Sequence, residues 1–169
     1  MANIHFQGKP LHTSGDLPAL GETAPDFELV NQQMETIRLS TFTGKRKVLN
    51  IVPSLDTPIC AASSRKFNQK ATHLVNTVVL VISADLPFAQ CRFCETEDLN
   101  DIIALSCFRS GFADDYGVKL IDSPLAGLTA RAVLVIDEND KVIYRELVAE
   151  LTEEPNYDNL LAVLSPSHH

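Results

Sequence analysis

The residues of this sequence best suited to chemistry are its four cysteines, Cys60, Cys91, Cys94 and Cys107. A thiol acts as a nucleophile or a redox group once it is ionised. In a chain of this length, free thiols serve catalysis, metal binding or core packing more often than a structural disulfide framework. The surroundings of each cysteine therefore decide which of these roles it fills.

Cys60 follows an apolar, strand-like segment and stands at the start of the first long helical pattern. Thr57 and Pro58 precede it and form a typical helix start, with a capping hydroxyl and a proline at the first helical position. In the first turn, free backbone N–H groups and the helix dipole lower the pKa of a thiol and favour the thiolate. Spacing alone leaves a small, buried and unreactive cysteine as an equal alternative.

The elements that must position Cys60 alternate between short β-branched segments and helical stretches, which predicts an α/β fold. Two nearly continuous apolar runs, 48–52 and 78–82, predict central strands covered on both faces and joined by one helix as a β-α-β crossover. The alternating β-branched segments that predict strands are 27–30, 37–40, 47–53, 77–84, 131–136 and 142–148, with a strand-like segment at 105–108.

Hairpins and further helices complete the predicted organisation. A polar turn at 137–141 predicts a hairpin between its flanking strands, and segments 3–6 and 10–13 predict a smaller hairpin at the amino end. Helices are predicted over 61–75, 88–94 and 157–164. No repeat or low-complexity linker divides the chain, so a single domain over residues 1–169 is expected.

Composition excludes several classes of function. The chain carries 14 basic and 22 acidic residues, a formal net charge of -8, so a nucleic-acid partner is not expected. Residues 1–10 lack the apolar core of a signal peptide and the apolar runs are too short to cross a bilayer, which predicts a cytoplasmic protein without membrane attachment. The terminal pair His168 and His169 is either native or the remnant of an added tag.

The residues around Cys60 match a known pattern. Pro53, three residues, Thr57, two residues and Cys60 resemble the active-site motif of peroxiredoxins. The likeness extends, in order and spacing, through residues 45–50, 67–69, 82–90 and 131–139, where the chain resembles bacterial thiol peroxidases of the atypical two-cysteine type. This resemblance implies a thioredoxin fold with an N-terminal β-hairpin extension and a central mixed sheet flanked by helices.

The resemblance also implies a function. The chain would be a thiol-dependent peroxidase acting on hydrogen peroxide and organic (alkyl) hydroperoxides, with no metal, haem or flavin cofactor. Cys60 would attack the peroxide, and Cys94 would resolve the resulting sulfenic acid as an intramolecular disulfide before further oxidation. Thr57 and Arg131 would hold the thiolate and the peroxide, and Pro53 would shield the sulfur.

The same resemblance predicts thioredoxin as the reductant and a homodimer as the assembly. Two cysteines in separate helices rarely meet the distance that a disulfide requires, so local unwinding around both is expected on oxidation. For Arg131, the alternative role is that of a solvated charge at the end of a strand. For Thr57 the alternative role is that of a helix cap only, and for Pro53 that of a strand terminator.

Cys91 departs from the family pattern and creates a C-x-x-C motif with Cys94. This pair suggests a second function, a dithiol-disulfide oxidoreductase, although such a motif normally stands at a helix start and this one lies inside a predicted helix. Cys91 also offers a spare resolving thiol, whereas Cys107 is expected in the core. The cysteine spacing does not favour a zinc site, and no histidine lies near Cys60 or Cys94 to form a protease pair.

Overall fold

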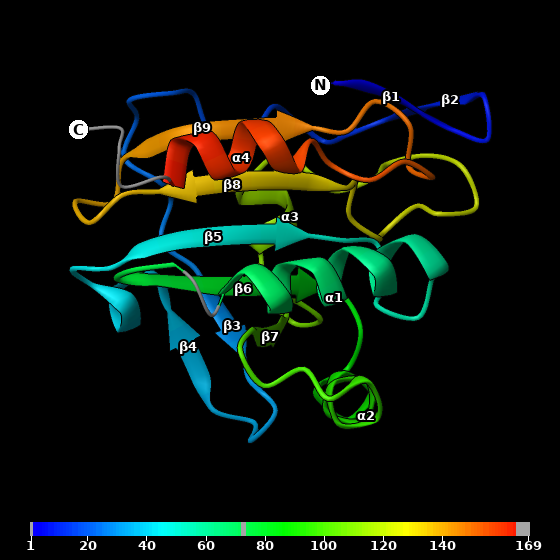
Figure 1. The fold of residues 1–169 in the computed structure, drawn as a ribbon. Helices are drawn as coiled ribbons and strands as arrows, with labels where there is room; N and C mark the ends of the chain where they lie inside the picture. The colour runs from blue at the N-terminus through cyan, green and yellow to red at the C-terminus, as the bar shows by residue number, and fades with distance from the viewer. Residues whose placement is uncertain (1, 72–73, 165–169) are drawn as a thin grey trace.

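The computed structural model describes residues 2–71 and 74–164, apart from the side chains of residues 58–60 and 71. A seven-stranded mixed sheet with the order β4-β3-β7-β6-β5-β8-β9 forms its centre, and a separate two-stranded hairpin, β1-β2, precedes it (Figure 1). The strands are β1 (Asn3–Phe6), β2 (Lys9–His12), β3 (Glu28–Val30), β4 (Thr36–Arg38), β5 (Arg46–Ile51), β6 (Thr77–Ser83), β7 (Ile103–Ser106), β8 (Ala132–Ile136) and β9 (Val142–Leu147).

Helices cover both faces of the sheet. They are the 3-10 helix η1 (Leu39–Phe42) and the α-helices α1 (Pro58–Ala71), α2 (Pro87–Glu97), α3 (Phe112–Asp115) and α4 (Tyr157–Leu164). In Figure 1, α1 and α4 lie in front of the sheet and α3 lies behind it. The predicted α/β class, the N-terminal hairpin and the mixed sheet flanked by helices are thereby confirmed.

Strand alternation divides the apolar core into two layers. Successive residues of β5 point to opposite faces, so Val48 packs with α1, α2 and α4 while Leu49 packs on the other side with α3. Phe67 of α1 and Cys94 of α2 belong to the first layer, and Phe112 of α3 belongs to the second. Burial on both faces explains why the central strands are nearly continuous in apolar residues.

Two predicted boundaries differ from those in the structure. The helix expected over 61–75 ends at Ala71, and Asn76, with φ 51°, turns the chain into β6. The strand expected over 37–40 stops at Arg38, because buried Leu39 begins the 3-10 helix η1. Residues 72–73 of the predicted helix and the terminal pair His168 and His169 lie outside the described residues.

Strand direction brings the predicted site to one edge of the sheet. β5 and β6 are parallel neighbours, so the loops that lead from them into α1 and α2 leave from the same edge. β8 is antiparallel to β5, and its first residue, Ala132, pairs with the last residue of β5, Ile51. Arg131 therefore enters the same edge from the opposite direction. This is the edge where α/β proteins commonly bind ligands.

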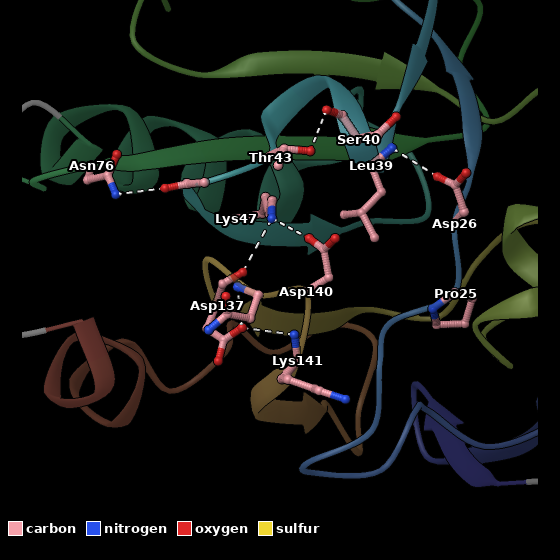
Figure 2. A network of polar contacts seen from close by, with 12 residues as sticks. Pro25, Asp26, Leu39, Ser40, Thr43, Lys47, Asn76, Asp137, Asp140 and Lys141 are labelled. Atoms are coloured by element: carbon pink, nitrogen blue, oxygen red, sulfur yellow. Dashed lines mark hydrogen bonds and ion pairs between the residues drawn. The ribbon is translucent and has the colours of Figure 1, made fainter.

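A buried lysine forms an ion pair at the opposite end of β5. Lys47 is 0% exposed, and its Nζ donates hydrogen bonds to Asp140 Oδ1 at 2.5 Å and to the Asp137 carbonyl oxygen at 3.3 Å (Figure 2). Asp137 and Asp140 form the turn between β8 and β9, in which Asp140 has a φ of 64°. Lys47 thus fastens the hairpin turn to the central strand rather than contributing to a surface charge patch.

Breaking this ion pair is expected to destabilise the fold strongly. Asp140→Asn keeps a residue that tolerates positive φ but leaves the buried Lys47 charge without its partner, at a cost of about 2–4 kcal/mol in the free energy of unfolding. Urea unfolding measures this loss. Adding Lys47→Met to Asp140→Asn removes the orphaned charge and should recover most of the stability. A double variant as unstable as Asp140→Asn would contradict the role given to the pair.

Candidate active site

Cys60 lies in the first turn of α1, as its sequence context predicts. β5 ends at Ile51, Pro53 is buried in the connecting loop, and α1 begins with Pro58. The Thr57 hydroxyl donates a hydrogen bond to the Ser54 carbonyl oxygen at 3.2 Å. The Cys60 side chain lies outside the described part of the structure, so its contacts remain a prediction.

The Asp85 carboxylate joins this loop to the end of β6 through hydrogen bonds. Asp85 Oδ1 accepts a hydrogen bond from the Ser54 hydroxyl at 2.8 Å, and Oδ2 accepts one from the Leu55 backbone N–H at 2.7 Å. The Ser83 hydroxyl donates to the same Oδ2 at 2.8 Å, and the Ser106 hydroxyl donates to the Asp85 backbone oxygen at 2.5 Å. Asp85 therefore holds the loop before Cys60 in register with the segment that begins α2.

Removing the Asp85 charge is expected to loosen the loop that positions Cys60. Asp85→Asn loses charge-assisted hydrogen bonds to Ser54 and Leu55, so kcat/KM for the hydroperoxide substrate that the motif resemblance implies should fall about 10- to 100-fold through lost positioning. Stopped-flow oxidation of the reduced protein measures this change. Ser83→Ala is the matched control, because it removes one bond to the same carboxylate and leaves the loop bonds intact. Equal rates in the two variants would remove Asp85 from the positioning role.

The second thiol of the predicted pair is buried on α2. Cys94 is 6% exposed and packs in the core layer that includes Leu55 and Phe67, and burial raises the pKa of its thiol. Cys91 is half-buried, and its Sγ donates a hydrogen bond to Glu95 Oε1 at 3.5 Å. Burial, followed by the hydrogen bond and charge of Glu95, raises the pKa of Cys91. The thiols of Cys91 and Cys94 are both free.

The position of this pair differs from that of a thioredoxin-like dithiol. α2 begins at Pro87, so Cys91 and Cys94 lie within the helix and not at its start. The low thiol pKa that a helix start provides is therefore missing at Cys91. Cys107 follows the end of β7 and is buried, and burial raises the pKa of its thiol to about 11. The core position expected for Cys107 agrees with this burial.

A cleft of about 770 Å³ separates the start of α1 from α2. Thr57 and Ala61, which flank Cys60 in the sequence, line one side of it. The other side is a face of α2 that carries two aromatic rings, Phe88 and Phe93, and a cation, Arg92. The complete lining is Leu55, Asp56, Thr57, Ala61, Asp85, Phe88, Ala89, Arg92, Phe93, Thr96 and Glu97.

Arg131 is a buried cation at the same edge of the sheet. It is 2% exposed, and its Nε and Nη2 donate to the Leu151 carbonyl oxygen at 3.1 and 2.9 Å. The Arg131 charge also acts on Tyr157 of α4. Burial and Glu154 raise the pKa of Tyr157, whereas the Ser63 hydroxyl and the Arg131 charge act to lower it. Ser63 lies one helical turn after Cys60 on α1. The alternative of a solvated charge at the strand end is therefore wrong for Arg131.

Comparison with known proteins assigns this arrangement to a family. Residues 19–161 match the family model described as Redoxin. The chain belongs to the Redoxin family. A relative from Corynebacterium glutamicum described as a thiol peroxidase is 50% identical over 98% of this chain and 100% of that protein. This Redoxin-family chain is accordingly a thiol peroxidase of the peroxiredoxin type, an oxidoreductase that acts on peroxides, as its motifs predicted.

Solved structures agree with the assignment to the Redoxin family. A peroxiredoxin-like protein from Aquifex aeolicus is 36% identical, with a TM-score of 0.92 over 97% of this chain and 96% of that chain. A thiol peroxidase from Chromobacterium violaceum has the same fold, with a TM-score of 0.92 at 24% identity over 100% of this chain and 99% of that chain. The thioredoxin-type fold expected from the motifs is confirmed.

Among the described residues, no group of three or more His, Cys, Asp or Glu side chains is placed to hold a metal ion. Within the same part of the chain, no helix has the length and apolar character needed to span a membrane.

The structure brings most of the predicted residues of this Redoxin-family site to one edge of the sheet. Pro53, Thr57 and the backbone of Cys60 come from the loop and first turn after β5, and Arg131 comes from the start of β8. Cys94 approaches from α2, on its buried side. Sequence reasoning gave no role to Asp85, although this residue lies in a segment that matches the family. Its position directly after a central strand was the available signal.

Proposed function

We propose that this thiol-dependent peroxidase reduces hydroperoxides at Cys60 and captures the oxidised sulfur with Cys94 in the same chain. The observation that carries the proposal is the position of Cys60 in the first turn of α1, beside a cleft whose far side is the helix that carries Cys94. The positive end of the helix dipole stabilises the thiolate there.

In the first step, the Cys60 thiolate attacks one peroxide oxygen, and the O–O bond breaks. The sulfur becomes a sulfenic acid, and the departing oxygen takes up a proton to leave as water or an alcohol. Arg131 is a fixed cation with donors suited to the developing negative charge on oxygen, and the Thr57 hydroxyl orients the peroxide. Pro53, which is buried in the loop between β5 and α1, shields the Cys60 sulfur from water.

In the second step, the Cys94 thiolate attacks the sulfur of the Cys60 sulfenic acid, a disulfide forms, and the hydroxyl leaves as water. Cys94 is packed in the core in the reduced protein, so α2 must loosen before the two sulfurs can meet. Separating the steps in this way lets the peroxide react with an ordered site before the resolving thiol arrives.

The cleft supports a preference for organic hydroperoxides over hydrogen peroxide. Phe93 offers apolar surface in the cleft, and Phe88 is 69% exposed at its rim. An alkyl or aryl group gains free energy by covering such surface, whereas hydrogen peroxide has none to bury.

The reductant and the assembly follow from the same proposal. Thioredoxin would reduce the disulfide, and a reducing compartment such as the cytoplasm would keep the thiols available for the next turnover. Leu86 and Phe88 expose apolar surface beside the cleft, which favours a homodimer that covers part of it.

Coupled turnover tests the proposal. Thioredoxin, thioredoxin reductase and NADPH are combined with cumene hydroperoxide and the reduced enzyme, and NADPH oxidation should continue over many turnovers. Cys94→Ser should consume about one equivalent of peroxide per chain and then stop, because the sulfenic acid has no resolving partner. No turnover in the wild-type protein, together with a disulfide that forms independently of Cys60, would instead favour the dithiol oxidoreductase.

A further inference from the structure

We propose that Cys91 is a third redox-active residue, which attacks Cys94 in the Cys60–Cys94 disulfide and leaves the oxidised enzyme as a Cys91–Cys94 disulfide with Cys60 free. The inference rests on the proposed function, because it begins from the disulfide that peroxide reduction creates. It adds an exchange step inside one helix and gives Cys91 a catalytic role.

Helix geometry places the two α2 thiols within reach of each other. Cys91 and Cys94 are three positions apart on α2 (Pro87–Glu97), and side chains at this spacing are neighbours on a helix, with Cβ atoms about 5–6 Å apart. A disulfide needs Cα atoms about 4.4–6.8 Å apart, a range that one helical turn satisfies. The Cys91–Cys94 bridge therefore needs a small adjustment, whereas the Cys60–Cys94 bridge joins two separate helices.

The exchange makes the disulfide more accessible to a reductant. Cys94 is 6% exposed and faces the core, whereas Cys91 is half-buried and stands beside Glu95 on the outer side of α2. A protein reductant must bring its own thiolate to one sulfur of the disulfide, so access to the disulfide limits the rate. Moving the disulfide to Cys91 brings one of its sulfurs to the surface.

The acidities of the three thiols favour the forward direction. In thiol-disulfide exchange the thiol of lowest pKa leaves fastest. The first turn of a helix, where Cys60 stands, is a position that favours the thiolate, whereas burial raises the pKa of Cys94, and burial with Glu95 raises that of Cys91. Cys60 is accordingly the best leaving group of the three.

The step is balanced without any added reagent. The Cys91 thiol loses its proton to solvent, its thiolate forms a new bond to the Cys94 sulfur, and the Cys60–Cys94 bond breaks with its electron pair on Cys60. One S–S bond replaces another, so no net oxidation occurs. With Cys60 released, the first turn of α1 and the Asp85 contacts to its loop can return to the arrangement that receives peroxide.

Disulfide mapping over time tests the exchange. Reduced wild-type protein, Cys91→Ser and Cys60→Ser are each treated with one equivalent of cumene hydroperoxide without reductant, quenched with acid at a series of times, alkylated and digested. Trypsin cuts after Arg92 and so separates Cys91 from Cys94. Mass spectrometry of the linked peptides then distinguishes the two bridges.

In the wild-type protein, the Cys60–Cys94 bridge should appear first and then be replaced by the Cys91–Cys94 bridge. The final ratio of Cys60–Cys94 to Cys91–Cys94 should be on the order of one to ten. In Cys91→Ser, the Cys60–Cys94 bridge should persist, and in Cys60→Ser neither bridge should form at that peroxide dose. A stable Cys60–Cys94 bridge in the wild type would overturn the inference. So would a Cys91–Cys94 bridge that forms equally fast in Cys60→Ser.

Failure of the proposed function has a different signature, since the wild-type protein would then consume no peroxide and Cys60 would remain alkylatable without any disulfide.

A further variant tests the role of Cys91 as nucleophile. Burial contributes most to the raised pKa of Cys91 and Glu95 adds to it, so Glu95→Gln should leave more thiolate near neutral pH and make the exchange faster. An exchange rate that is unchanged by Glu95→Gln and independent of pH would contradict attack by Cys91.

Discussion

Cys60→Ser is expected to lower kcat/KM for cumene hydroperoxide by at least about 10⁴-fold, because the serine hydroxyl does not ionise near neutral pH and oxygen is a poor nucleophile toward peroxide. In the proposed mechanism, the helix terminus and Arg131 would still bind and polarise the peroxide, but no atom would accept the transferred oxygen. Stopped-flow consumption of peroxide by the pre-reduced protein measures the loss directly, without dependence on the reductant.

Cys107→Ala provides the matched control for this variant. Cys107 is also a free cysteine, but it is buried after β7, and burial raises its pKa to about 11, so it contributes little thiolate at neutral pH. Its replacement should leave peroxide kinetics within about twofold, even where removal of a buried side chain lowers stability. Peroxidase activity that is retained in Cys60→Ser, or lost in Cys107→Ala, would contradict the assignment of Cys60 as the nucleophile.

The fold was largely predictable because its signals are local or periodic. The apolar runs of β5 and β6 predicted central parallel strands, and Thr57 with Pro58 predicted where α1 begins. The strand boundary at Leu39 moved because of tertiary packing, since burial of this side chain ends the strand early. Such an effect depends on a partner that is distant in the sequence.

Polar contacts between distant segments were the part that the sequence did not reveal. Lys47 reads as one of three consecutive basic residues, yet its burial depends on the turn between β8 and β9, three strands later in the chain. Asp85 reads as one residue of a motif, yet its function depends on the Ser54 hydroxyl and Leu55 N–H of a loop far away in the chain. Local propensity carries no information about such pairings, because they form only when the sheet brings the segments together.

Arg131→Gln is expected to lower kcat/KM for hydroperoxide about 10²- to 10³-fold. The variant removes a buried positive charge at the edge of the sheet where α1 begins, and with it the donors proposed to stabilise negative charge on the departing oxygen. Glutamine keeps hydrogen-bonding capacity toward the Leu151 carbonyl oxygen, which limits structural damage. The loss should fall on the peroxide step and leave reduction of the disulfide by thioredoxin unchanged.

Two further variants separate this chemistry from support of the fold. Arg145 is an arginine of β9 that also donates to backbone carbonyl oxygens, those of Leu17 and Pro18, but it pairs with Leu134 in the middle of β8, away from the edge where α1 begins, so Arg145→Gln should leave peroxide kinetics unchanged. Arg131→Lys retains the charge without the planar fork of donors and should lie between Arg131→Gln and the wild type. If Arg131→Gln and Arg145→Gln lost similar Tm and similar activity, Arg131 would be a structural residue, because a guanidinium that acts on the peroxide must affect rate more than stability.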